Sequence, residues 1–161
     1  MNITLYVNGG KVSLDVEPNE TLLEVLRHRL KLKSVKRGCQ EGDCGVCTVL
    51  VDGRPVYSCL VLAGAVDGCE VLTIEGLKGR DSFQKLVESF VENHAVQCGY
   101  CTPGMIITAY YLLQQGGSLS EDDIRKGLEG NMCRCTGYVN IVKAVASACQ
   151  KTGLLKGEKE E

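Results

Sequence analysis

The pattern of apolar and polar residues predicts a small β-sheet with one helix in the first half of the chain. Apolar residues alternate with polar ones over residues 3–7 and 12–16, and the turn Asn8-Gly9-Gly10 between them predicts a β-hairpin. Thr21 and Glu24 have the spacing of a capping box, so we expect a helix to begin here and to pack its apolar face on the sheet.

A second hairpin and a further strand follow a loop that is rich in cysteine and glycine. Residues 48–51 and 54–57 flank an Asp52-Gly53 turn, and residues 70–74 have the composition of a strand that would close the sheet. Hairpin, helix, cysteine loop and hairpin is the order expected of a β-grasp ferredoxin. The first half is therefore expected to fold as this type of α+β domain.

The second half of the chain changes to a helical period. Its apolar residues recur every three or four positions, and Pro103 lies in the first turn of an expected helix, where its missing N–H costs nothing. The four expected helices cover residues 82–93, residues 102–115, a short segment that begins at Ser120, and residues 138–151. We therefore expect a four-helix bundle after the sheet.

The length of 161 residues suggests one domain or two small ones. The polar, glycine-containing segment 75–80 separates the two halves, so we expect a ferredoxin-like domain over residues 1–76 and a helical domain over residues 80–155. Residues 156–161 are expected to form a solvated tail. Domains of under about 100 residues have small cores and often need a bound metal for stability.

Eight of the ten cysteines fall into two groups of four with different spacing. The first group has the x4, x2 spacing of plant-type ferredoxins, which hold one 2Fe–2S cluster on four thiolates, and glycines lie beside its cysteines. Glycine allows backbone N–H groups to approach the sulfur atoms closely. The two groups are Cys39, Cys44, Cys47 and Cys59, and then Cys98, Cys101, Cys133 and Cys135.

Two other uses of these cysteines compete with iron–sulfur clusters. Disulfides form in oxidising compartments, but the start of the chain has neither the basic nor the apolar region of a signal peptide, so we expect a cytoplasmic protein. Four-cysteine zinc sites usually consist of two separated close pairs, whereas the first group here is a compact triple with one distant member. The spacing favours clusters and leaves zinc as an alternative.

Charge and hydropathy exclude further classes of protein. The formal net charge of −2 does not favour binding to nucleic acid or to an anionic membrane. The longest uninterrupted apolar stretch, residues 59–66, is far shorter than the roughly 20 residues that span a bilayer. No nucleophile–base arrangement or phosphate-binding loop is present, so we expect substrate chemistry to occur on another protein.

Two cysteine runs of the second half, together with the first cysteine loop, resemble a known family. Gln97-Cys-Gly-Tyr-Cys-Thr-Pro-Gly-Met105 and Asn131-Met-Cys-Arg-Cys-Thr-Gly-Tyr138 are similar to signatures of the small iron–sulfur subunit of the xanthine oxidase family of molybdenum hydroxylases. The loop 38–47 and the segment 73–77 match as well, so the resemblance covers nearly the whole chain. Tyr100 stands where many relatives have phenylalanine, and we expect this difference to have little effect.

The resemblance implies an electron-transfer subunit that carries two 2Fe–2S clusters. In this family the cluster of the helical domain lies next to molybdopterin on a large subunit, and the ferredoxin cluster faces FAD, usually on a medium subunit. Electrons would pass singly from molybdopterin through the clusters to the flavin or to an external acceptor, in a complex expected to be a dimer of heterotrimers. The resemblance also implies that Gln97 contacts the pterin through its side chain and that the sulfur of Cys135 lies close to it.

Alternatives to this function remain open at the level of sequence. A freestanding two-cluster ferredoxin-like redox adaptor would carry the same cysteines, and a zinc-stapled interaction module is a third possibility. Gln97 would otherwise be an ordinary surface amide. Cys69 and Cys149 lie outside both groups and are interpreted as incidental or buried thiols.

Overall fold

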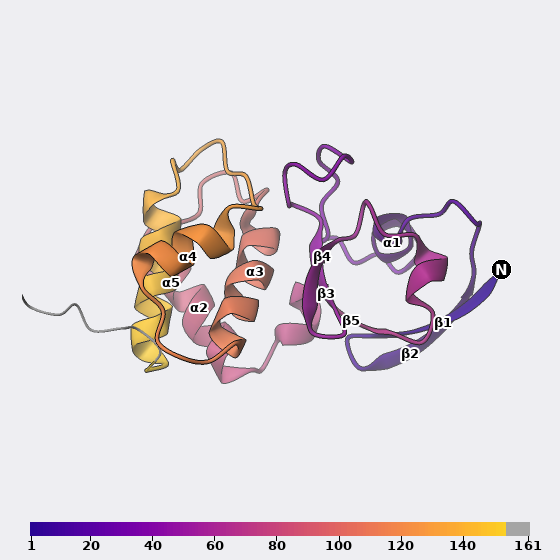
Figure 1. Cartoon of the computed structure of the whole chain (residues 1–161), viewed down its shortest axis with the longest axis horizontal. Helices are drawn as coiled ribbons and strands as arrows, with labels where there is room; N and C mark the ends of the chain where they lie inside the picture. The colour runs from indigo at the N-terminus through magenta and orange to yellow at the C-terminus, as the bar shows by residue number, and fades with distance from the viewer. Residues whose placement is uncertain (154–161) are drawn as a thin grey trace, which may run out of the picture.

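The computed structural model describes residues 1–153 and shows a mixed α/β fold, with a small sheet followed by a helical part (Figure 1). The five strands are β1 (Asn2–Val7), β2 (Gly10–Asp15), β3 (Thr48–Val51), β4 (Arg54–Tyr57) and β5 (Glu70–Leu72). The five α-helices are α1 (Leu22–Glu24), α2 (Asp81–Glu92), α3 (Thr102–Gln114), α4 (Glu121–Leu128) and α5 (Val139–Lys151). The expected ferredoxin-like part followed by a helical part is confirmed.

The sheet has the strand order β2-β1-β5-β3-β4. Both hairpins form as expected, because Asn8 and Gly9, with φ of 52° and 83°, and Asp52 and Gly53, with φ of 46° and 75°, adopt the left-handed conformation of type I′ turns. Strand β5 lies between the hairpins, parallel to β1 and antiparallel to β3. It ends at Leu72, two residues earlier than expected.

The helix after the first hairpin differs from the expected regular α-helix. Its capping box is present, since the Thr21 hydroxyl accepts from the Glu24 N–H and the Glu24 carboxylate accepts from the Thr21 N–H. After three residues, however, the chain widens into a π-helix, η1 (Val25–Arg29), in which the N–H of Leu30 donates to the carbonyl of Val25. The apolar face is buried as expected, because the side chains at positions 22, 23, 25 and 26 belong to the core of the sheet.

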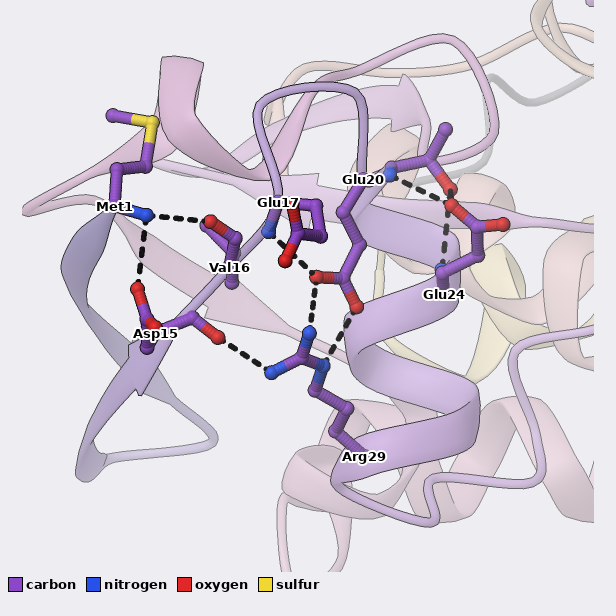
Figure 2. Close-up of polar contacts among 8 residues, drawn as sticks. Met1, Asp15, Val16, Glu17, Glu20, Glu24 and Arg29 are labelled. Atoms are coloured by element: carbon purple, nitrogen blue, oxygen red, sulfur yellow. Dashed lines mark hydrogen bonds and ion pairs between the residues drawn. The ribbon is translucent and has the colours of Figure 1, made fainter.

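Figure 2 shows the polar contacts that join the start of the chain to this helix. The N-terminal ammonium of Met1 donates to the Asp15 carboxylate at 2.9 Å and to the Val16 carbonyl at 2.7 Å. The guanidinium of Arg29 donates to both carboxylate oxygens of Glu20, at 2.7 and 2.6 Å, and to the carbonyl of Asp15 at 2.6 Å. These contacts fix the end of β2 against η1.

The helices of the second half begin where their local sequence predicts. Pro103 lies in the first turn of α3, and Ser120 and Asp123 form the capping box of α4. Helix α5 begins after Tyr138, which has a left-handed φ of 69°. Helix α2 packs against α3 and α5, and α4 packs against α3 and α5.

Two apolar cores meet at the sheet. Along β3 the side chains alternate, so Val49 packs in the core beneath the sheet and Leu50 packs in the helical core. The segment 75–80, expected to be a polar linker, is partly ordered as a short 3₁₀-helix, η3 (Ile74–Leu77). Its Leu77 is fully buried in the helical core. Burial of this side chain stabilises the folded segment by about 2 kcal/mol, although the other residues of the segment are mostly polar.

Among residues 1–153 no helix is long and apolar enough to cross a membrane. The expected tail at residues 156–161 lies outside the described residues, as do the last two residues of the expected helical domain.

Candidate metal centres

The first group of cysteines lies on the loop between η1 and β3 and just after β4. Three backbone N–H groups of this loop point at one sulfur, because those of Glu41, Asp43 and Cys44 lie 3.5, 3.3 and 3.4 Å from the Sγ of Cys39. The N–H of Cys39 in turn lies 3.4 Å from the Sγ of Cys44. A loop that directs several N–H donors at its thiols is suited to holding them as thiolates.

The electrostatics of Cys39 agree with this geometry. Hydrogen bonds from the N–H groups of Glu41 and Cys44 lower the pKa of Cys39 to about 6, with the Asp43 N–H adding to the effect against the smaller opposing effect of burial. Since the thiolate is the form that binds metal, this loop favours the form in which Cys39 could serve as a ligand.

Glycine is required where the loop closes over its own cysteines. A Cβ at position 38 would lie 2.6 Å from the Sγ of Cys44. Gly45 has a φ of +65°, and a Cβ there would lie 2.1 Å from the carbonyl of Gly130. Glycine therefore occupies the positions at which a sulfur atom or a second loop approaches the backbone too closely for a Cβ.

The thiols of each group are associated in pairs. In the first group the thiol of Cys44 contributes to the lowered pKa of Cys39, and the thiol of Cys47 contributes to the raised pKa of Cys59. In the second group the pairs are Cys101 with Cys133, and Cys98 with Cys135. Four thiols in each group are the number of ligands that a 2Fe–2S cluster takes.

The second group of cysteines lies at the N-terminus of α3 and on the loop between α4 and α5. The Thr136 hydroxyl donates to the Sγ of Cys133 at 3.1 Å, and the Tyr138 hydroxyl accepts from the Cys133 N–H at 3.1 Å. Burial by itself would raise the pKa of Cys133, but the hydrogen bonds from Thr136 and from the Cys135 N–H lower it overall. For Cys101, burial and the neighbouring Cys133 thiol outweigh the hydrogen bond from its own N–H and raise its pKa to about 12.

The second centre opens onto the surface, whereas the first is more enclosed. Cys98 and Cys135 are exposed, while Cys47, Cys59 and Cys133 are buried. A cavity of about 530 Å³ lies over the second group and is lined by its four cysteines together with Tyr100 and Arg134, among others. The exposed cysteine pair therefore faces outward, and the Cys101–Cys133 pair faces the rest of the chain.

The two cysteine loops touch each other directly. The N–H of Met132 donates to the carbonyl of Cys44 at 2.9 Å, and the side-chain amide of Asn131 donates to the carbonyl of Gly45 at 2.9 Å. The Tyr57 hydroxyl, two residues before Cys59, donates to the carbonyl of Gly130 at 2.8 Å. These loops, one from the sheet and one from the helical part, lie together along the upper side of Figure 1.

The remaining candidate residues are not part of these contacts. Gln97 is exposed, and its side chain makes no hydrogen bond with any residue in the range 1–153. Cys149 is buried in the helical core, where burial raises its pKa to about 11, and Cys69 is half-buried near Asp67. Within the described part of the chain, no group of three or more His, Cys, Asp or Glu side chains is arranged to hold a metal ion.

Sequence reasoning assigned no role to three residues that the structure brings to the centres. Asn131 is buried between the two loops, Thr136 bonds a cysteine sulfur, and the Tyr100 hydroxyl donates to the carbonyl of Arg37. Asn131 and Thr136 both lie within the second cysteine run, so the signal available in the sequence was a polar residue close to a candidate ligand. Nothing local to Tyr100 indicates a partner 63 positions earlier in the chain.

Comparison with known proteins agrees with this geometry. Residues 5–75 match the family of 2Fe–2S iron–sulfur cluster binding domains, and residues 73–146 match a second family of 2Fe–2S binding domains. The chain is 45% identical over 151 residues to the nicotinate dehydrogenase small FeS subunit of Eubacterium barkeri, covering 94% of this chain and 96% of that protein. It is 43% identical over 154 residues to the xanthine dehydrogenase iron-sulfur-binding subunit of Escherichia coli O157:H7, again covering 94% and 96%.

A solved structure shares the fold along the whole length. The crystal structure of quinoline 2-oxidoreductase from Pseudomonas putida 86 superposes with a TM-score of 0.86 and 41% sequence identity, over 96% of this chain and 98% of that chain. Fold, cysteine geometry and matches together define a protein with two 2Fe–2S cluster-binding parts.

The chain belongs to the family of small iron–sulfur subunits of the xanthine oxidase family of molybdenum hydroxylases. It is an electron-transfer subunit of an oxidoreductase complex in which substrate chemistry takes place on other subunits. Family membership decides for iron–sulfur clusters over the zinc module and over disulfides.

Proposed function

We propose that this chain carries electrons one at a time from molybdopterin on a large subunit to FAD on a medium subunit, or to an external acceptor. Cys98, Cys101, Cys133 and Cys135 would hold the cluster that receives electrons first, and Cys39, Cys44, Cys47 and Cys59 would hold the cluster that passes them on. When bound, each 2Fe–2S cluster accepts and releases a single electron.

The observation that carries this proposal is the direct contact between the two cysteine loops. From Cys133 to Cys44 the connection consists of one peptide unit and the hydrogen bond from the Met132 N–H to the Cys44 carbonyl. Two cysteine groups joined by so short a connection are suited to act in series. The outward-facing pair, Cys98 and Cys135, supports electron entry at the helical part, where a partner can approach.

The surface around this entry point supports docking of the large subunit. Large apolar side chains are exposed here rather than buried, and an exposed apolar group around a functional site is typical of a protein interface. The exposed residues are Val96, Tyr100, Met132, Tyr138 and Val139. The exposed amide of Gln97 lies on the same loop as Cys98, which supports its proposed contact with the pterin.

We also propose the finer organisation that the sequence suggests. The packing of α2, α3, α4 and α5 around one core supports a four-helix bundle, and the separate cores support a β-grasp domain over residues 1–76 and a helical domain over residues 80–155. The names of the relatives as small subunits support a complex with larger chains, proposed to be a cytoplasmic dimer of heterotrimers. Purification of the native complex should yield a molybdenum-containing large chain and an FAD-containing medium chain.

Iron analysis and electron paramagnetic resonance test the two-cluster assignment. The purified full chain should contain four irons, and reduction should give two distinguishable 2Fe–2S signals, one from each cysteine group. Cys44→Ser should remove one signal and spare the other. Cys69→Ser, which changes a cysteine outside both groups, is the matched control and should retain both signals. Loss of both signals in Cys44→Ser, or of neither, contradicts two independent sites.

A second substitution tests the proposed pterin contact. Gln97→Ala should leave both clusters assembled, because glutamine is not a ligand, but should lower molybdopterin retention or slow reduction of the first cluster by substrate. Gln84→Ala, which removes another exposed amide from α2, is the control. A Gln97→Ala complex with full molybdopterin content and unchanged electron transfer would disprove the contact.

A further inference from the structure

Tyr100 joins the two cysteine loops by a contact that is separate from those of Asn131 and Met132. Its hydroxyl donates to the carbonyl of Arg37 at 2.5 Å, and its ring lies beneath the Lys36 ammonium, which is 5.8 Å from the ring centroid. Arg37 lies two residues before Cys39, and Tyr100 lies between Cys98 and Cys101.

This contact differs from the others in the segments that it connects. The bonds of Asn131 and Met132 join the loop before α5 to the first cysteine loop, and the bond of Gly130 joins the same loop to Tyr57 of β4. Within residues 1–153, the Tyr100 hydroxyl makes the sole hydrogen bond between the Cys98–Cys101 segment and the first cysteine loop. The Cys98–Cys101 segment and the loop before α5 are thus bonded to the first cysteine loop by separate contacts.

We propose that the Tyr100 hydroxyl is a positioning group that holds the two cluster-binding loops at a fixed separation. The inference rests on the proposed function, because it assumes a cluster on each loop. Electron tunnelling slows steeply with distance, so a contact that limits movement between the loops also limits variation in the rate of transfer between clusters. Phenylalanine at this position fills the same space and faces the same lysine but cannot donate to the Arg37 carbonyl. The tyrosine is thus proposed to have an effect, contrary to the expectation from the sequence.

The test compares Tyr100→Phe with the unchanged full chain, both carrying their clusters. Loss of one hydrogen bond should accelerate amide hydrogen exchange about two- to tenfold in both segments, residues 36–41 and 97–101. Magnetic interaction between the two reduced clusters depends on their separation, so the spin–spin broadening of their resonance signals should change. Tyr6→Phe is the matched control, since Tyr6 is similarly exposed and its hydroxyl has no hydrogen-bond partner among the described residues.

Unchanged exchange in either segment, or an unchanged spin–spin interaction, overturns the proposal. Faster exchange in both segments together with an altered interaction supports it, provided that Tyr6→Phe behaves like the unchanged chain. Failure of the proposed function would be seen separately, as the absence of two cluster signals from the unchanged chain. The exchange measurement does not need those signals, so it tests the contact between the loops in either case.

Discussion

Replacement of Asn131 by alanine should destabilise the folded chain more than the small size of the asparagine side chain suggests. Asn131 is 4% exposed and lies between the two cysteine loops. Its amide donates to the Gly45 carbonyl at 2.9 Å and to the Thr48 hydroxyl at 3.3 Å, and its carbonyl oxygen accepts from the Thr108 hydroxyl at 2.8 Å. One side chain therefore joins the loop before α5 to β3 and to α3.

The expected loss of stability follows from the hydrogen bonds that each partner of Asn131 keeps after the substitution. The Gly45 carbonyl keeps the Thr48 hydroxyl at 2.6 Å and the Thr48 N–H at 3.2 Å, so it loses only the net value of one hydrogen bond, about 1 kcal/mol. The Thr108 hydroxyl is left buried without this acceptor, which costs about 1–3 kcal/mol. The free energy of unfolding should fall by about 2–4 kcal/mol, equivalent to about 4–16 °C in the midpoint of thermal unfolding for a chain of this length.

Thermal unfolding of the cluster-loaded chain, followed by circular dichroism at one heating rate, measures this loss. A fixed rate is necessary because proteins that lose a cofactor on unfolding often unfold irreversibly. Thr108→Val removes one of the three hydrogen bonds and should lower the midpoint by roughly half as much. Ser13→Ala removes only an exposed contact with Thr4 and should have almost no effect. A decrease below about 2 °C in Asn131→Ala would refute the assignment of Asn131 as a buried bridge.

Two further predictions concern a single hydrogen bond and an ion pair. Thr136→Val removes the hydroxyl that donates to the Cys133 sulfur. The reduction potential of the cluster proposed on the second cysteine group should then fall by about 20–60 mV, the equivalent of a hydrogen bond of about 0.5–1.5 kcal/mol. In a redox titration, Thr136→Ser should keep the original potential, because serine retains the hydroxyl. Glu20→Gln disrupts the two-point ion pair with Arg29 shown in Figure 2 and should cost about 0.5–1 kcal/mol at low salt. That difference in denaturant midpoint should shrink in 1 M salt, and a salt-independent loss would contradict an electrostatic origin.

Features determined by neighbouring residues could be predicted from the sequence. The capping boxes at Thr21 and Ser120 and the turns at Asn8 and Asp52 depend on side chains and backbone angles within four residues. The cysteine spacing was informative for the same reason, because the ligands of a cluster loop are close in sequence. Family resemblance supplied the function, which the local pattern alone left open.

Features that depend on distant partners could not be predicted in this way. The π-helix at 25–29 has apolar residues in the same positions as an α-helix would, so its wider turn leaves no mark in the pattern. Leu77 looked like one apolar residue in a polar linker, yet it is buried among helices that follow it in the chain. Asn131 contacts a residue 86 positions earlier, and no spacing within its own run encodes that contact.

The contact between the loops gives a physical reason for two cluster-binding parts to share one short chain. Each part has a small core of its own, and a loop that holds a cluster must be ordered at a cost of conformational entropy. Here the second loop orders the first, because Asn131 and Met132 donate to the carbonyls of Gly45 and Cys44. Gly45 has no room for a Cβ against Gly130, so the loops approach to backbone contact. On separate chains the same contact would also require association of two proteins, whereas within one chain the connecting residues keep the loops together.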